Sequence, residues 1–141
     1  MKHLLKHLTV VGLIVGAFWA LTAWPLINDV ETGKTPQYPD LHVTDFGAGV
    51  ERVTQAVKTV VGRLPGWTLV GSGSGPAGGE IQAVRTTRLL RFKDDVTIRI
   101  RREGGRTQVS VRSRSRIGKI DFGQNARNIQ ELLAELNQEV F

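Results

Sequence analysis

The hydrophobic pattern of the chain opens with an uncharged, mostly apolar run from Leu8 to Ile27. A helix of that length is about 30 Å long, which matches the hydrocarbon core of a bilayer. Lys2 and Lys6 precede the run, whereas the first residues after it carry no positive charge. The pattern predicts a transmembrane anchor over residues 8–27, with residues 1–7 in the cytoplasm. The run lacks the A-x-A spacing of a cleavage site, which disfavours the alternative of a cleaved signal peptide.

Small residues recur at every fourth position within this run, at Gly12, Gly16 and Ala20. This spacing places them on one face of a helix, where their lack of bulk lets a second helix approach closely. Glycine and alanine are also ordinary residues of membrane helices, so the stripe has a plain interpretation as well. The functional interpretation predicts a homo-oligomer, or a complex with another membrane protein, formed through a helix that also contacts membrane lipid.

The pattern changes after the apolar run. Residues 28–44 contain two prolines and no regular period, which predicts an extended tether. Residues 45–64 have apolar side chains at every third or fourth position, as an amphipathic helix does, and Pro65 follows them. A second helical stripe begins after Asp121, which forms a capping-box pattern with Gln124.

Between the two helical stripes, apolar and polar residues alternate with a period of two. The predicted strands are residues 67–71, 80–88, 95–102 and 107–116. The sequence from Gly71 to Gly79 predicts a flexible loop, and the two glycines of Glu103–Arg106 predict a hairpin turn. Residues 45–141 are therefore expected to form an extracytoplasmic two-layer α+β domain, with a four-stranded antiparallel sheet and two helices packed on one face.

Charge adds a candidate surface to this picture. The chain has 19 Lys and Arg against 13 Asp and Glu, and it has no cysteine, which excludes disulfides and thiolate catalysis. Five arginines gather on the outward positions of the last two predicted strands: Arg99, Arg101, Arg112, Arg114 and Arg116. This face is either simply solvated or binds an anionic partner, such as a lipid headgroup, a small ligand or an acidic protein surface. Nucleic acid is disfavoured because these strands carry no aromatic side chain on which a base stacks.

The best candidates for acid–base chemistry are the adjacent carboxylates Asp94 and Asp95. Adjacent residues of a strand point to opposite faces, so a structural position in the turn between two strands is the simpler interpretation. His3 and His7 have the spacing of helical metal ligands, but a position at the membrane interface is the favoured interpretation. The sequence therefore predicts no catalytic residue, no metal and no cofactor.

Five short motifs also run through the chain in order. They are W-P-L-I-N-D-V at 24–30, G-E-I-Q-A at 79–83, T-T-R at 86–88, F-K-D-D-V at 92–96 and R-S-R-S-R-I-G-K-I-D-F-G-Q-N at 112–125. Together they resemble the domain-of-unknown-function family numbered 1499. The resemblance implies an uncharacterised bacterial envelope or membrane-associated protein, here with a periplasmic domain on the inner membrane. The polar motif residues, whose role the resemblance leaves unknown, are Asn28, Asp29, Arg88, Lys93, Asp94, Asp95, Asp121 and Asn125.

The favoured function is a non-enzymatic interaction or stabilising module, such as an accessory subunit of a membrane protein complex. The alternative is the binding of an anionic lipid or a small ligand by the basic sheet face. An enzyme of unknown chemistry is the third possibility.

Overall fold

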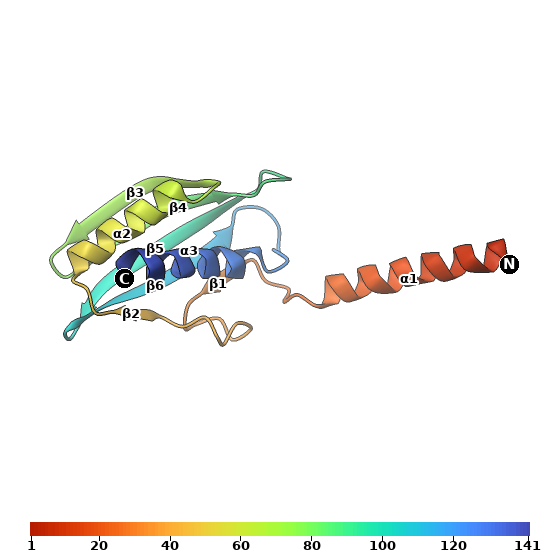
Figure 1. Cartoon of the computed structure of the whole chain (residues 1–141), viewed down its shortest axis with the longest axis horizontal. Coiled ribbons are helices and arrows are strands. Elements are labelled where there is room, and N and C mark those ends of the chain that lie inside the picture. Colours follow the sequence, from red (N-terminus) through yellow and green to blue (C-terminus); the bar gives the residue numbers. More distant parts are fainter.

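The computed structural model describes residues 1–141, apart from the side chains of Lys2, Ala20 and Leu21. One helix, α1 (Lys2–Thr22), projects from a two-layer domain that contains all the other elements (Figure 1). The elements of the domain are β1 (Asp29–Glu31), β2 (Thr44–Phe46), α2 (Val50–Arg63), β3 (Trp67–Gly75), β4 (Gly78–Thr86), β5 (Lys93–Glu103), β6 (Arg106–Ser115) and α3 (Gln124–Val140).

The structure corrects the prediction of a membrane anchor. Helix α1 ends at Thr22, so the last five residues of the predicted span lie outside it. The uncharged helical stretch from Leu8 to Thr22 is about 22 Å long, shorter than the roughly 30 Å of a hydrocarbon core. Among the helices of the described residues, none combines the length and the apolar character needed to cross a membrane. This finding contradicts the predicted single-pass anchor and the inner-membrane localisation that depended on it.

The predicted stripe of small residues is only partly described. Gly12 and Gly16 both lie in α1, and a Cβ added at either position would have nothing within 4 Å. The side chain of Ala20 lies outside the described residues. Helix packing through this stripe therefore stays a prediction.

The sheet has six antiparallel strands instead of the predicted four, in the order β1-β6-β5-β4-β3, and β2 also pairs with β6. The first additional strand, β1, comes from the segment predicted to be a tether, and the second, β2, spans the end of that segment and the start of the predicted first helix. Both pair with the same edge of β6, with Asp29 opposite Arg114 and Thr44 opposite Val109. Each has only three residues, which is too short to show a period of two in the sequence.

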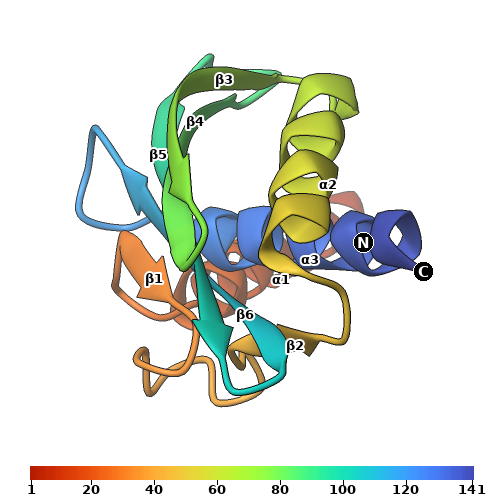
Figure 2. The ribbon, with the colours of Figure 1, turned by 90° about the vertical axis from the view of Figure 1, so that its left-hand side faces the viewer.

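Helices α2 and α3 cover one face of the sheet, so the core lies between them and the strands (Figure 2). Helix α2 begins at Val50, later than predicted, because Thr44–Phe46 pairs with β6 as a strand. The side chain of Phe46 is buried in the core all the same. The helical stripes therefore identified the packed faces correctly, while the start of the first helix was predicted too early.

The glycine-rich segment predicted to be a flexible loop forms the end of β3, the turn and the start of β4 in an ordered hairpin. Gly78 has a φ of +137°, and a Cβ there would clash with the carbonyl oxygen of Ile100 on the neighbouring strand β5. At Gly79, an added Cβ would clash with the carbonyl oxygen of Gly73 in the same way. These glycines allow neighbouring strands to approach closely. The other predicted turn, between Glu103 and Arg106, is confirmed.

Candidate functional site

The open face of the sheet, opposite the helices, carries the charged side chains that sequence alternation placed there. Register pairs Arg99 with Ser110 and Arg101 with Gln108 across β5 and β6. Arg112 lies opposite Glu31 of β1. Since successive residues of a strand point to opposite faces, the hydrophobic residues between these positions face the core.

Acidic residues from the neighbouring strands neutralise much of this face. Arg112 binds Asp29 through two parallel contacts, with Nε 2.9 Å from Oδ1 and Nη2 2.5 Å from Oδ2. These hydrogen bonds from Arg112 lower the pKa of Asp29, and the same pairing raises the pKa of Arg112. Arg99 lies 3.1 Å from a carboxylate oxygen of Glu31 and 3.1 Å from one of Glu80. The face is therefore a network of ion pairs and not a uniformly basic patch.

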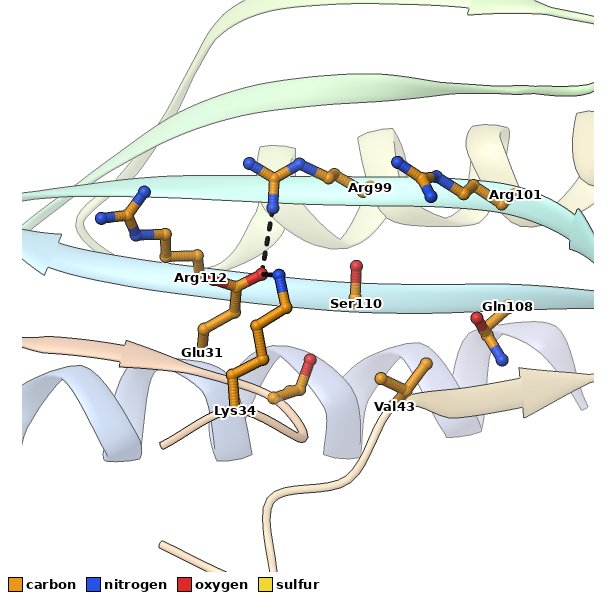
Figure 3. Close-up of a pocket in the computed structure, with 9 residues that line it drawn as sticks. Glu31, Lys34, Val43, Arg99, Arg101, Gln108, Ser110 and Arg112 are labelled. Atoms are coloured by element: carbon orange, nitrogen blue, oxygen red, sulfur yellow. Dashed lines mark hydrogen bonds and ion pairs between the residues drawn. The ribbon is translucent and has the colours of Figure 1, made fainter. Parts of the chain in front are cut away.

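A hollow of about 440 Å³ opens on this face (Figure 3). Its lining residues are Glu31, Thr32, Lys34, Val43, Arg99, Arg101, Gln108, Ser110 and Arg112. Strands β5 and β6 form its floor, and the segment between β1 and β2 contributes Thr32, Lys34 and Val43. We call this feature the cationic hollow, because four of its lining residues are cations and one is an acid.

Arg101 differs from the other three cations of the cationic hollow. Lys34 Nζ lies 2.7 Å from Glu31, and Arg99 and Arg112 also have carboxylate partners. For Arg101, which is exposed, the described residues provide no carboxylate within 4.0 Å. Its guanidinium therefore keeps its donors available beside the hydroxyl-bearing floor of the hollow.

The remaining two predicted arginines lie away from the hollow. Arg114 is largely exposed and lies 4.0 Å from Asp29, a contact of little energy. Arg116 follows β6 and binds both carboxylate oxygens of Asp95. Its Nε lies 3.0 Å from each oxygen, and its Nη2 lies 2.7 Å from Oδ1. The structure thus brings together three of the five predicted arginines, Arg99, Arg101 and Arg112, in one site.

A second polar cluster lies inside the domain, where β5 and β6 meet the start of α3. The Asn125 side chain is fully buried. Its Oδ1 accepts a hydrogen bond from Ser113 Oγ at 2.6 Å, and its Nδ2 donates one to Asp121 Oδ2 at 2.7 Å. It also donates to the carbonyl oxygen of Asn28 at 3.0 Å. Four of the eight motif residues, Asn28, Asp94, Asp121 and Asn125, belong to this buried polar cluster.

The other motif residues are dispersed. Asp29 and Asp95 lie on the open face in ion pairs, and Arg88 and Lys93 are exposed at one end of the domain. Asp94 and Asp95 both lie in β5, so the position in a turn was wrong, whereas the predicted strand that begins at Asp95 is confirmed. Their side chains do point to opposite faces, as strand geometry requires.

Asp94 is the buried acid of the cluster, with only 2% of its surface exposed. Burial raises the pKa of Asp94, and the charge of Asp121 raises it further. Hydrogen bonds from Asn128 and Ser115 and the charge of Arg85 act in the opposite direction, but burial is the larger effect. Compared with the unfolded chain, the fold therefore shifts Asp94 towards its protonated form.

This preference predicts a pH dependence that Asp94→Asn should remove. The contribution of protonated Asp94 to stability is fully present below the unfolded pKa and is lost as the pH rises through the folded pKa. As pH rises, the unfolding free energy of wild type should therefore fall relative to that of Asp94→Asn. The full difference should be about 1.4 kcal/mol for each unit by which the pKa of Asp94 differs between the folded and unfolded states. Urea denaturation at several pH values measures the separation.

Asp95→Asn is the matched control, since Asp95 is the exposed neighbour in the same strand. It removes a carboxyl group from the same strand and costs only an exposed ion pair with Arg116, about 0–1 kcal/mol. If the unfolding free energies of Asp94→Asn and wild type differ by the same amount at every pH, the raised pKa of the buried Asp94 carboxyl is contradicted.

Sequence reasoning missed Ser113, Ser115 and Asn128 as members of the buried polar cluster. Asn128 Nδ2 donates to Asp94 Oδ2 at 2.9 Å and to Ser113 Oγ at 3.1 Å. The signal was present in the pattern. Ser113 continues the inward-facing series of Val109 and Val111, and Asn128 lies on the buried stripe of α3. A polar residue at a core position is normally there to satisfy another buried polar group.

The comparisons with known proteins complete the description of the site. No curated protein matches the chain significantly. The profile of a family described as "Protein of unknown function (DUF1499)" matches residues 24–136, which include both the cationic hollow and the buried polar cluster. The match confirms the resemblance that the five motifs carry, while the envelope association it implies stays a prediction. Because it covers most of the sequence and all the strands of the domain, the chain belongs to the DUF1499 family.

Proposed function

We propose that the chain is a binding module rather than an enzyme, and that the cationic hollow takes a small anion bearing phosphate or carboxylate groups. The observation that carries the proposal is the unpaired guanidinium of Arg101 in a hollow whose other cations are held by carboxylates. An anionic group at this position would supply the partner that Arg101 lacks. Such a ligand would also find hydroxyl and amide groups on Ser110 and Gln108.

The ion pairs around Arg101 support binding in preference to catalysis. Glu31 is bound by both Lys34 and Arg99, so its carboxylate is already engaged by two cations. The arrangement fixes the cations in place before a ligand arrives, so little side-chain freedom remains to be lost on binding. Preorganised donors of this kind give orientation and selectivity for a small anion.

The experiment is a titration of the full ¹⁵N-labelled chain with sodium pyrophosphate, and separately with sodium citrate, followed by amide chemical shifts. Shifts should concentrate in residues 31–34, 99–101 and 108–112, which border the cationic hollow. They should weaken as salt is added, because the attraction is electrostatic. The two probes distinguish a phosphate ligand from a carboxylate ligand.

The same titration has a clear contrary outcome. Shifts confined to the exposed cations near Arg88 and Lys93, or no shifts at millimolar concentration of either anion, would exclude the cationic hollow as the binding site.

A further inference from the structure

Three segments of the chain meet at the end of the domain nearest α1 (Figure 1). They are residues 24–27, 87–92 and 116–123, which we call the apolar tip. Backbone hydrogen bonds join them to each other and to the sheet: Asp121 N donates to Ile27 O at 3.0 Å, and Arg116 N donates to Lys93 O at 3.0 Å. The three segments are therefore held at the same end of the domain.

The apolar tip exposes large hydrophobic side chains in an unusual concentration. Leu89 is 90% exposed and Ile117 is 70% exposed. The other strongly exposed members are Leu26, Leu90, Phe92 and Phe122. Single exposed apolar residues are ordinary on protein surfaces, but several gathered on adjacent loops mark an interaction site.

Cations without partners surround these side chains. Arg88, Arg91, Lys93 and Lys119 are exposed, and the ion pairs of the described residues include none of them. The nearby carboxylates do not offset this charge, because Asp94 and Asp121 are buried within the domain. Asp95 is already bound to Arg116. The exposed side chains of the apolar tip are thus either apolar or positively charged.

The backbone of the tip is also strained at two of these positions. Arg91 has a φ of 57° and Phe122 a φ of 51°, values that side chains other than glycine adopt at an energetic cost. At both positions the strained residue is exposed and contributes a cation or an aromatic ring to the tip. The chain thus maintains an unfavourable backbone where it presents these groups to solvent.

We propose that the apolar tip docks onto an anionic phospholipid surface. Projecting apolar side chains enter the boundary between headgroups and acyl chains, while adjacent cations bind the headgroup phosphates. A lipid surface accepts separate projecting side chains without the matched shape that a protein interface requires. This docking involves loops alone and requires no segment to cross a bilayer.

The test uses the absence of cysteine from the chain, which allows a single labelling site. Leu89→Cys, at a position that is already exposed, carries a polarity-sensitive dye on the tip of the full chain. Gly105→Cys is the matched control in the β5–β6 turn, where an added Cβ meets nothing within 4 Å. Helix α1 also exposes apolar side chains, so the dye position, and not binding alone, locates the contact.

Vesicles containing phosphatidylserine should shift the emission of the dye at position 89 to the blue and leave the dye at position 105 unchanged. Removing two cations, Arg91→Gln with Lys93→Gln, should weaken vesicle binding about 25-fold, at roughly fivefold for each cation. Neutral phosphatidylcholine vesicles should give a much smaller shift. Equal shifts at both dye positions, or vesicle binding that leaves the dye at position 89 in water, would overturn the proposal. No shift with any vesicle would assign the tip to a protein partner instead.

Discussion

Replacing Asn125 with alanine is expected to lower the free energy of unfolding by about 3–5 kcal/mol. The Asn125 side chain is fully buried and connects the last strand to the start of α3. It accepts from Ser113, and its amide group donates to Asn28 O, Ser115 Oγ and Asp121 Oδ2. Alanine removes these four buried hydrogen bonds, each worth about 0.5–1.5 kcal/mol and about 1.5–3 kcal/mol for the one to the Asp121 carboxylate.

Urea denaturation of the full chain measures this loss. Asn137→Ala is the matched control, because it makes the same change on an exposed position of the same helix. The control should change stability by no more than about 0.5 kcal/mol. A loss at Asn125 as small as that of the control would show that the buried polar cluster is not what joins α3 to the sheet.

The regular parts of the fold were predictable because they are long and one of their faces is buried. Strands β5 and β6 alternate apolar and polar residues over ten or more positions, joined by a turn in which Gly104 has a φ of +59°. Helices α2 and α3 show their buried stripes at the spacing of a helix. Over such lengths, the hydrophobic pattern alone decides which face meets the core.

The parts that could not be predicted depend on contacts far away in the sequence. Strands β1 and β2 are stabilised by pairing with β6, more than sixty residues later, and show no pattern of their own. The glycines of β3 and β4 were interpreted as a flexible loop because glycine is typical both of flexible segments and of places where strands approach closely. The end of α1 was predicted five residues too late because hydrophobicity continues past Thr22 while the helix does not.

The capping pattern at Asp121 formed only in part. Its carboxylate accepts the backbone N–H groups of Gly123 and Asn125 at 2.8 and 3.0 Å. Gln124, however, donates to Asn128 instead of reaching back along the chain. Sequence spacing identified the start of the helix, but the partners of these side chains were decided by the neighbouring polar cluster.

The candidate site, like the fold, was predictable only in part. Alternation correctly placed Arg99, Arg101 and Arg112 on the open face. It could not show that Asp29 and Glu31 would come from a short strand to neutralise two of them. The sequence pattern therefore predicted more free positive charge on this face than the structure has. The candidate binding site is the part of the cationic hollow around Arg101.

Arg101→Gln is expected to weaken the binding of a small anion by about 10- to 100-fold, which corresponds to one charge-assisted hydrogen-bonded contact of about 1.5–3 kcal/mol. The fold should be unaffected, because Arg101 is exposed and has no carboxylate partner among the described residues. Arg102→Gln is the matched control. It removes the same charge from the next residue, which points to the opposite face of the sheet.

The direct measurement is isothermal titration calorimetry of the full chain with whichever of pyrophosphate or citrate binds the wild type. Binding by the cationic hollow predicts a large loss of affinity in Arg101→Gln and near wild-type affinity in Arg102→Gln. Equal affinity in the two variants would contradict the assignment of the hollow as the ligand site.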